Sequence, residues 1–188
     1  AMMRAGSYEG NFKIYCHEEL ADTIMQLCRL TLVRKFTCFL GDRILIKKVK
    51  DGGEKKAAGM VLTFFDIHST KTKQFGFRAC FEDGMVLSCL GDEPYKEITR
   101  PYVEGSDWLL SEAFCLDRDK EIFHPYEKHH STALDAGRLA EELHVSNLVL
   151  YHTEDTCLEK RKESYSREAA LSFRGTVYVP LDLERIRL

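Results

Sequence analysis

The feature that most constrains the fold is an alternation of short apolar runs with a helical segment in the second half of the chain. Residues 108–112 (WLLSE) and 147–151 (NLVLY) each have enough consecutive apolar side chains for a buried strand. Residues 131–143 between them are predicted to form a helix, with Ser131 or Thr132 available as its N-cap. Buried strands that alternate with helices are typical of a sheet covered by helices on at least one face. The sequence therefore predicts an α/β fold.

The first half of the chain is richer in strands. Residues 11–15 are predicted to form a strand, and residues 17–32 a helix, because leucine and isoleucine recur there at helical spacing. Asp83-Gly84 is predicted to be the turn of a hairpin. Further strands are predicted at 43–49, 59–67, 76–82, 85–90 and 176–179, and a further helix at 165–173. The opening strand has no obvious partner nearby, which suggests a domain entered in the middle.

Composition places the chain among globular proteins of about one domain. It has 188 residues, of which 44% are hydrophobic and 30% charged, and its formal net charge is −3. Nothing in this balance indicates a nucleic-acid-binding arm or a membrane-surface patch, and no apolar run approaches the roughly 18–20 residues of a membrane span. No signal-peptide pattern opens the sequence. Its seven cysteines include no C-x-x-C pair, which favours reduced thiols and a cytoplasmic location.

Three polar residues stand where predicted strands end. His68 and His152 directly follow their strands, and Asp92 follows its strand after Gly91. Side chains at strand ends meet at one edge of an α/β sheet, where active sites are usually assembled. Imidazole nitrogen and carboxylate oxygen are ligands that suit Zn²⁺ or a similar ion. The sequence therefore predicts a metal site of His68, Asp92 and His152, although each residue alone could simply be a polar residue at a loop boundary.

Two further residues are candidates for catalysis. His130 precedes the predicted helix start, where backbone N–H groups favour an anionic ligand, so it could contact a phosphate or protonate a leaving group. A solvent-exposed histidine at a helix entry is the alternative. Glu112 ends an apolar strand, and because a buried carboxylate needs a partner, we expect it to orient a metal-ligand or catalytic histidine. Three other histidines lack such a setting and are predicted to be structural or at the surface: His17, His124 and His144.

Five segments carry a resemblance to a known family. Residues 68–78 (HSTKTKQFGFR) match a strand-His-loop-(F/Y)-G-(F/Y)-R pattern, and residues 85–92 (MVLSCLGD) match a strand ending in Gly-Asp. Residues 109–114 (LLSEAF), 130–133 (HSTA) and 148–153 (LVLYHT) resemble an L-(x)-x-E-A-(T)-F segment, in which the bracketed positions can be absent, an H-S/T-T-A motif and an L-x-L-x-H strand. In this order, over about two-thirds of the chain, they resemble the metallo-β-lactamase-fold hydrolases, most closely the ribonuclease Z branch.

The resemblance implies the second half of a metallo-β-lactamase αββα sandwich. The family's signature, H-x-H-x-D-H, supplies two ligands to each of two metals and occurs nowhere in this sequence. The N-terminal β-β-α part of the fold is expected to be missing with it. Residues 1–188 are therefore expected to form a single incomplete metallo-β-lactamase-like domain.

The resemblance also implies a role for each candidate residue. His68 would ligate one metal, His152 the other, and Asp92 both. His130 would contact the substrate phosphate or the leaving oxygen with Glu112 behind it, so the implied catalytic set is His130, Glu112 and Asp92. The complete protein is expected to be a hydrolase of phosphodiesters that uses two zinc ions. This chain alone is expected to be inactive, or to bind one metal weakly.

Three alternatives remain open from the sequence. The fold could serve another substrate, such as a thioester or a lactone. The half-fold could be non-catalytic and act by association, including homodimerisation through an exposed sheet edge. The chain could also be an unrelated α/β binding module.

A nucleic-acid substrate has thinner support. Basic residues could edge a groove, although charge runs are more often solvated surface. These residues are Lys47, Lys48, Lys55, Lys56, Lys71, Lys73 and Arg78. The tight hairpin before Gly91-Asp92 leaves no counterpart of the long flexible arm with which the transfer-RNA processors of this family grip their substrate. The sequence therefore favours a small phosphodiester.

Overall fold

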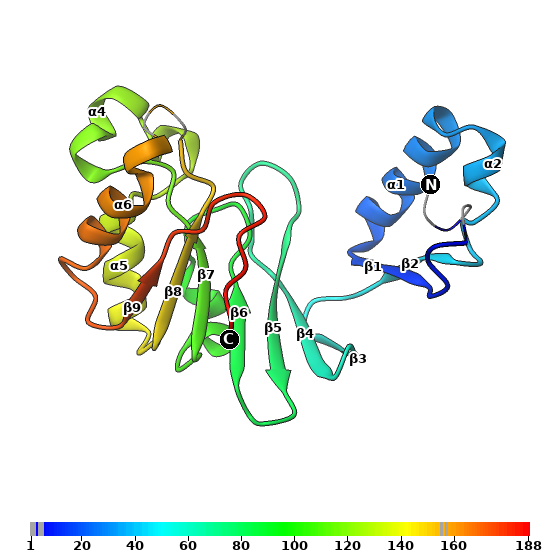
Figure 1. The fold of residues 1–188 in the computed structure, drawn as a ribbon, viewed down its shortest axis with the longest axis horizontal. Coiled ribbons are helices and arrows are strands. Elements are labelled where there is room, and N and C mark those ends of the chain that lie inside the picture. Colours follow the sequence, from blue (N-terminus) through cyan, green and yellow to red (C-terminus); the bar gives the residue numbers. More distant parts are fainter. Residues whose placement is uncertain (1–2, 4–5, 155, 157) are drawn as a thin grey trace. The chain divides into compact units, whose positions relative to one another are not determined.

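The computed structural model describes residues 3, 6–154, 156 and 158–188, which form two compact units (Figure 1). The first unit comprises residues 1–53 and the second residues 54–188. No helix among the described residues is long and apolar enough to cross a membrane.

The first unit is a small β-α-β arrangement. Its elements are β1 (Phe12–Cys16), α1 (Glu18–Thr31), α2 (Arg34–Thr37) and β2 (Ile44–Lys48). β1 pairs with β2 in parallel, with Phe12 opposite Ile44, so the prediction of an opening strand without a partner is wrong. Two parallel strands need a crossover connection, and α1 with α2 supplies it. His17 is buried and caps α1, with its Nδ1 accepting from the backbone N–H of Leu20 at 3.3 Å, which agrees with the structural role expected for it.

The second unit is built on a seven-stranded sheet in the order β3-β4-β5-β6-β7-β8-β9. The strands are β3 (Gly53–Ala57), β4 (Met60–Asp66), β5 (Phe75–Phe81), β6 (Val86–Cys89), β7 (Trp108–Glu112), β8 (Asn147–Tyr151) and β9 (Thr176–Tyr178). β4, β5 and β6 pair antiparallel, whereas β6 to β9 pair in parallel. As a result β4, β6, β7, β8 and β9 run in one direction, and their carboxyl ends lie at the same edge of the sheet.

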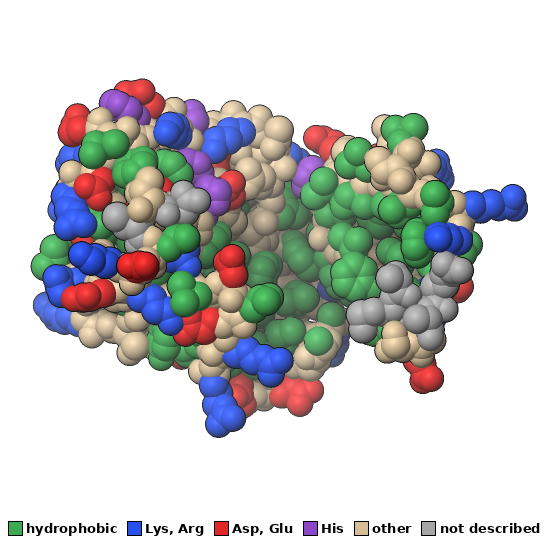
Figure 2. Space-filling model, turned by 45° about the horizontal axis from the view of Figure 1, so that its top comes forward, with side chains coloured by type: hydrophobic (Ala, Val, Ile, Leu, Met, Phe, Trp, Pro, Cys, Tyr) green, Lys and Arg blue, Asp and Glu red, His purple; other side chains and the backbone are tan. Residues whose placement is uncertain are grey.

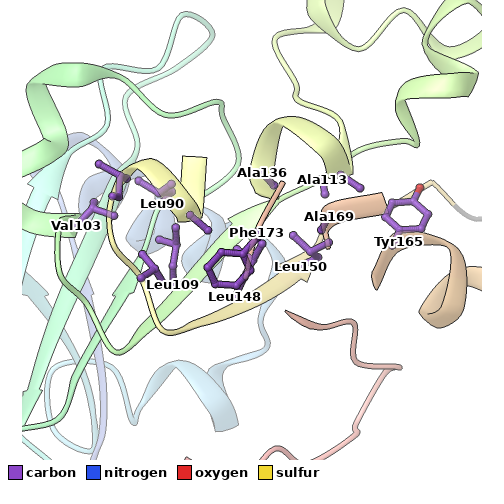
Figure 3. Close-up of a cluster of buried hydrophobic side chains, with 14 of the residues drawn as sticks. Leu90, Val103, Leu109, Ala113, Ala136, Leu148, Leu150, Tyr165, Ala169 and Phe173 are labelled. Carbon is purple, nitrogen blue, oxygen red and sulfur yellow. The ribbon is translucent and has the colours of Figure 1, made fainter. Parts of the chain in front are cut away.

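Helices α5 (Ala133–Glu142) and α6 (Arg161–Ala169) pack beside each other against β7, β8 and β9. Leu109, Leu148 and Leu150 of the sheet meet Ala136 of α5 and Ala169 of α6 in the main apolar core (Figure 3). Small side chains let the two helices approach closely. The shorter helical segments are η1 (Glu97–Thr99), α3 (Arg100–Val103), η2 (Asp117–Asp119), α4 (Lys120–Phe123), η3 (Tyr126–Lys128) and η4 (Leu158–Lys160).

A complete capping box fixes the start of α5. The Thr132 side chain accepts from the backbone N–H of Asp135 at 3.2 Å, and Asp135 Oδ2 accepts from the backbone N–H of Thr132 at 3.1 Å. Such a box satisfies two N–H groups that a helix start otherwise leaves unpaired. Of the two N-cap candidates in the sequence, Thr132 is the one used, and Ser131 is free for another contact.

Two details of the predicted secondary structure are wrong. β3 was not expected, because its sequence GEKKA has three charged residues and no apolar alternation. The helix expected at 165–173 begins and ends four residues earlier, because its first turn is polar and carries no periodic apolar signal. The other predicted strands and the two longer helices lie within one or two residues of their expected positions.

Candidate metal centre

The carboxyl ends of three adjacent parallel strands build the centre. Asp92 follows β6, Glu112 ends β7 and His152 follows β8. Gly91 and His152 have positive φ angles, 76° and 54°, a conformation that turns the chain sharply at the strand end. The Tyr151 hydroxyl donates to the Gly91 carbonyl and so ties the Asp92 loop to β8.

His130 joins these residues from the loop before α5. Asp92 Oδ1 lies 3.2 Å from Nε2 of His152 and 3.8 Å from Nδ1 of His130. The two imidazole rings stack with their centroids 4.9 Å apart, and the Phe114 ring lies 5.0 Å from that of His130 and 6.2 Å from that of His152. Figure 2 shows histidine side chains lying against an acidic side chain on the surface of the second unit. The structure thus brings four of the five predicted site residues together.

Glu112 lies behind His130 and is almost completely buried. Its Oε1 accepts from the backbone N–H of Ser131 at 2.7 Å and from the Ser131 hydroxyl at 2.6 Å, and its Oε2 lies 3.4 Å from Nδ1 of His130. Burial raises the pKa of Glu112 to about 7, although the Ser131 hydrogen bonds oppose the shift. The hydrogen-bond partner of the buried carboxylate is therefore Ser131, and His130 lies beside its second oxygen without a hydrogen bond.

The neighbours of His130 indicate which of its two ring nitrogens carries the proton. Lys71 Nζ lies 3.3 Å from Nε2, and because an ammonium group can only donate, Nε2 accepts and Nδ1 carries the proton. Nδ1 then faces the carboxylate of Glu112. Burial lowers the pKa of His130, and the Lys71 charge lowers it further; Nε2 is directed away from Glu112.

The donor set suits a divalent metal ion. Asp92, His130 and His152 each offer a ligand atom, and these atoms lie within 4.8 Å of one another. Asp92 Oδ1, Glu112 Oε2 and His130 Nδ1 are buried and have no hydrogen-bond partner within the described part of the chain. Buried polar atoms without a partner are costly, and a cation bound by Asp92 Oδ1 would remove that cost at Asp92. One carboxylate and imidazole nitrogens are typical zinc ligands.

His68 stands apart from this cluster. β4 runs in the same direction as β6, so His68 lies at the same edge of the sheet, but the cluster of close donor atoms does not include it. Its side chain is exposed, its φ is 54°, and its backbone N–H donates to Asp66 Oδ1 at 2.8 Å. Ligation by His68 stays a prediction.

Two residues at the centre were not identified as site residues from the sequence. Glu93, directly after Asp92, is a buried acid that holds the loop following β4, and Lys71 in that loop reaches His130. A second acid beside Asp92 was the available signal, but its burial cannot be read from the sequence. Arg78, expected at the edge of a basic groove, is half-buried and donates to the Tyr102 carbonyl at 2.9 Å, and its place at a groove stays a prediction.

A cavity of about 230 Å³ adjoins the centre. Tyr95, Tyr126, His130, Ser131 and Leu139 are among the residues that line it. A larger hollow of about 420 Å³ lies between β3, β4 and β5, and none of the predicted site residues lines it. Because a cavity of about 150 Å³ can hold benzene, the smaller cavity is large enough for one aromatic ring with a substituent.

The arrangement of strands and helices recurs in solved structures. The metallo-β-lactamase fold protein YhfI from Bacillus subtilis superposes with a TM-score of 0.69 and 23% identity, covering 94% of this chain and 65% of that one. The short form of human tRNase Z superposes with a TM-score of 0.65 and 16% identity, covering 94% and 67%. Zn²⁺-bound PqqB from Methylobacterium extorquens also has a TM-score of 0.65, at 15% identity, with 92% and 63% covered. The chain has the metallo-β-lactamase fold.

Sequence relatives point to one branch of this fold. Ribonuclease Z of Oceanobacillus iheyensis is 33% identical over 93 residues, 50% of this chain and 30% of the relative. Ribonuclease Z of Thermobifida fusca is 25% identical over 149 residues, 78% of this chain and 45% of the relative. The sequence matches no family model. The predicted resemblance to ribonuclease Z is confirmed, and the chain spans less than half the length of these two relatives.

Proposed function

We propose that this chain forms part of a metal-dependent hydrolase that cleaves phosphodiesters. The observation that carries the proposal is the convergence of Asp92, His130 and His152 at the ends of the strands, with Asp92 Oδ1 buried and unpartnered within the described residues. The similarity to ribonuclease Z supports the choice of phosphodiesters. The name ribonuclease Z, which two of the relatives carry, makes RNA the second candidate substrate.

Asp92 and His152 would hold zinc, joined by His68 from β4. When bound, zinc supplies a water of lowered pKa and polarises the phosphoryl group. His130 would act in proton transfer, because its Nε2 faces away from Glu112 and its Nδ1 proton faces that carboxylate. Glu112 would keep this orientation, since its other oxygen is fixed by Ser131. Because the H-x-H-x-D-H ligands are absent from the sequence, we expect weak metal binding and only slow turnover in this chain alone.

The size of the substrate is the second part of the proposal. The cavity beside His130 accommodates one aromatic ring, and β5 and β6 are joined by a tight turn in which Phe81 N–H donates to the Met85 carbonyl at 2.9 Å. Both features support a small phosphodiester over a transfer RNA. Thioesters and lactones remain alternatives, although no feature of the centre favours them.

We also propose that the two units belong to one incomplete domain. The first unit has only 53 residues, and its described part buries few side chains, namely Cys16, His17, Ala21 and Val49. Chains of that size rarely bury enough surface to be stable alone.

Hydrolysis of a bis-aryl phosphodiester in the presence of zinc tests the proposal. We expect slow zinc-dependent release of the phenol that is lost in Asp92→Asn and retained in the control His124→Ala. Precursor transfer RNA, a thioester and a lactone complete the substrate panel. Activity that survives Asp92→Asn, or that requires no metal, would contradict the proposal, as would turnover of a thioester alone.

A further inference from the structure

The loop after β4 places a cation at the centre. Lys71 is an exposed residue, yet its Nζ lies 3.3 Å from Nε2 of His130, the ring nitrogen that faces away from Glu112. The acids at this edge of the sheet, Asp92 and Glu112, would repel an anionic substrate. A cation in front of His130 offsets that repulsion at the place where a substrate oxygen would be received.

Glu93 fixes the loop that carries Lys71. Its Oε1 accepts from the Ser69 hydroxyl at 2.7 Å, from the backbone N–H of Thr70 at 2.9 Å and from the Thr70 hydroxyl at 3.1 Å. The carboxylate is almost fully buried and is satisfied by the loop itself.

Lys96 adds a second attachment to the same loop. Its Nζ lies 3.5 Å from Glu93 Oε2 and donates to the backbone carbonyl of His68. The Ser69 hydroxyl in turn accepts from the backbone N–H of Lys71 at 3.2 Å. Both carboxylate oxygens of Glu93 thus help to fix the backbone from His68 to Lys71, one by direct hydrogen bonds and the other through Lys96. A cation on a fixed backbone loses less conformational freedom on binding than one on a free loop.

We propose that Lys71 is an anion-binding residue of the centre that receives a non-bridging phosphoryl oxygen, and that Glu93 is its positioning residue. The proposal rests on the proposed phosphodiesterase function for its ligand class. A lysine ammonium is a compact point charge with three donors and suits a phosphate oxygen. Binding would replace the contact to Nε2 of His130 by a contact to the anion, which frees that nitrogen for proton transfer.

Binding of inorganic phosphate to the full chain tests the proposal. Calorimetric titration is carried out on the metal-free protein and on the protein supplied with zinc. Lys71→Met is expected to weaken phosphate binding at least about tenfold in both states, the loss typical of one charge-assisted hydrogen bond. The matched control is Lys73→Met, since Lys73 lies in the same loop but pairs with Asp66 at 3.7 Å, and it should change binding less than about twofold.

Glu93→Gln separates positioning from charge at the anion. The variant keeps the Lys71 side chain but removes the carboxylate charge that holds its loop. It should therefore weaken phosphate binding less than Lys71→Met does, and its circular dichroism spectrum should show an intact fold. Equal effects of the two lysine variants, or wild-type phosphate affinity in Lys71→Met, would overturn the proposal. The zinc affinity of Lys71→Met should be unchanged. If phosphate binding fails to depend on Lys71 while zinc binding depends on Asp92, the anion site is wrong and the hydrolase proposal stands.

Discussion

Glu112 is a buried acid whose two oxygens have different surroundings. Ser131 satisfies Oε1 with two short hydrogen bonds, whereas Oε2 faces the Nδ1 atom of His130 without a hydrogen bond. The first pair of bonds sets the position of the carboxylate, and the second contact sets the ring orientation of the histidine. The same residue therefore serves the stability of the loop and the chemistry proposed for His130.

Replacement of Glu112 separates these two roles. Glu112→Ala leaves the N–H and hydroxyl of Ser131 without their buried acceptor and should lower the free energy of unfolding by about 2–4 kcal/mol. Glu112→Gln keeps an oxygen at the Oε1 position and should cost about 1 kcal/mol or less. Urea denaturation in the presence of a chelator measures both values. Equal losses in the two variants would show that Ser131 does not depend on this acceptor.

Single residues at strand ends could be predicted from the sequence, whereas contacts between loops could not. Asp92 and His152 directly follow apolar runs, and Glu112 ends one, so their common edge followed from the expected parallel strands. Lys71 and Glu93 meet their partners through the folding of separate loops, and no spacing rule links Glu93 to Ser69 and Thr70. Their parts in the centre became visible only with the packing.

At the scale of elements, α5 places the site because its start and its distance from α6 are fixed. The capping box at Thr132 sets where the helix begins, at Ala133, three residues after His130. Gly137 sets how closely the helix approaches α6, because a Cβ atom added there would lie 2.4 Å from the carbonyl oxygen of Ala169. A side chain at this position would therefore force the backbone of α5 or that of α6 to shift.

Gly137→Ala tests that close approach. In an open helix the change would stabilise by about 1 kcal/mol, but here the clash with the Ala169 carbonyl should reverse the sign and cost about 1–3 kcal/mol. The control is Arg138→Ala, whose side chain is 64% exposed and should alter stability by less than about 0.5 kcal/mol. Thermal or urea unfolding gives both values. A more stable Gly137→Ala variant would contradict the packing of α5 on α6.

Elements with a strong apolar period were predictable, and those without one were not. β7 and β8 have nearly continuous apolar sequences and were placed correctly. β3 forms because β4 offers it a hydrogen-bonding edge, which is a tertiary effect that overrides a charged sequence. β1 was expected to lack a partner because parallel pairing with β2 joins residues about 30 apart in the chain.

At the scale of the whole molecule, the sheet edges bear on the predicted homodimer. β3 is one edge strand of the seven-stranded sheet and carries Glu54, Lys55 and Lys56, all exposed. The opposite edge strand, β9, has three residues. Short or charged edge strands disfavour pairing with a second chain. Dimerisation through a sheet edge stays a prediction, and these features argue against it.

The fold class and the order of the site residues could be predicted because the sheet collects its strand ends at one edge. The division of the chain into two units after Gly53 could not be predicted, since it depends on which segments pack together and not on any linker signal in the sequence. The metal centre belongs to this scale as well, because β4, β6 and β8 each lead to one predicted ligand and the loop before α5 places His130 beside two of them.

Zinc binding by the full chain is the most direct test of this centre. Competition with a chromophoric chelator gives the stoichiometry and the affinity for the wild type, Asp92→Asn, His152→Ala and the exposed-histidine control His124→Ala. We predict one zinc ion per chain, bound weakly, with affinity at least about tenfold lower in Asp92→Asn and His152→Ala and unchanged in His124→Ala. A wild-type chain that binds no zinc, or the same affinity in all four proteins, would contradict a metal centre at these strand ends.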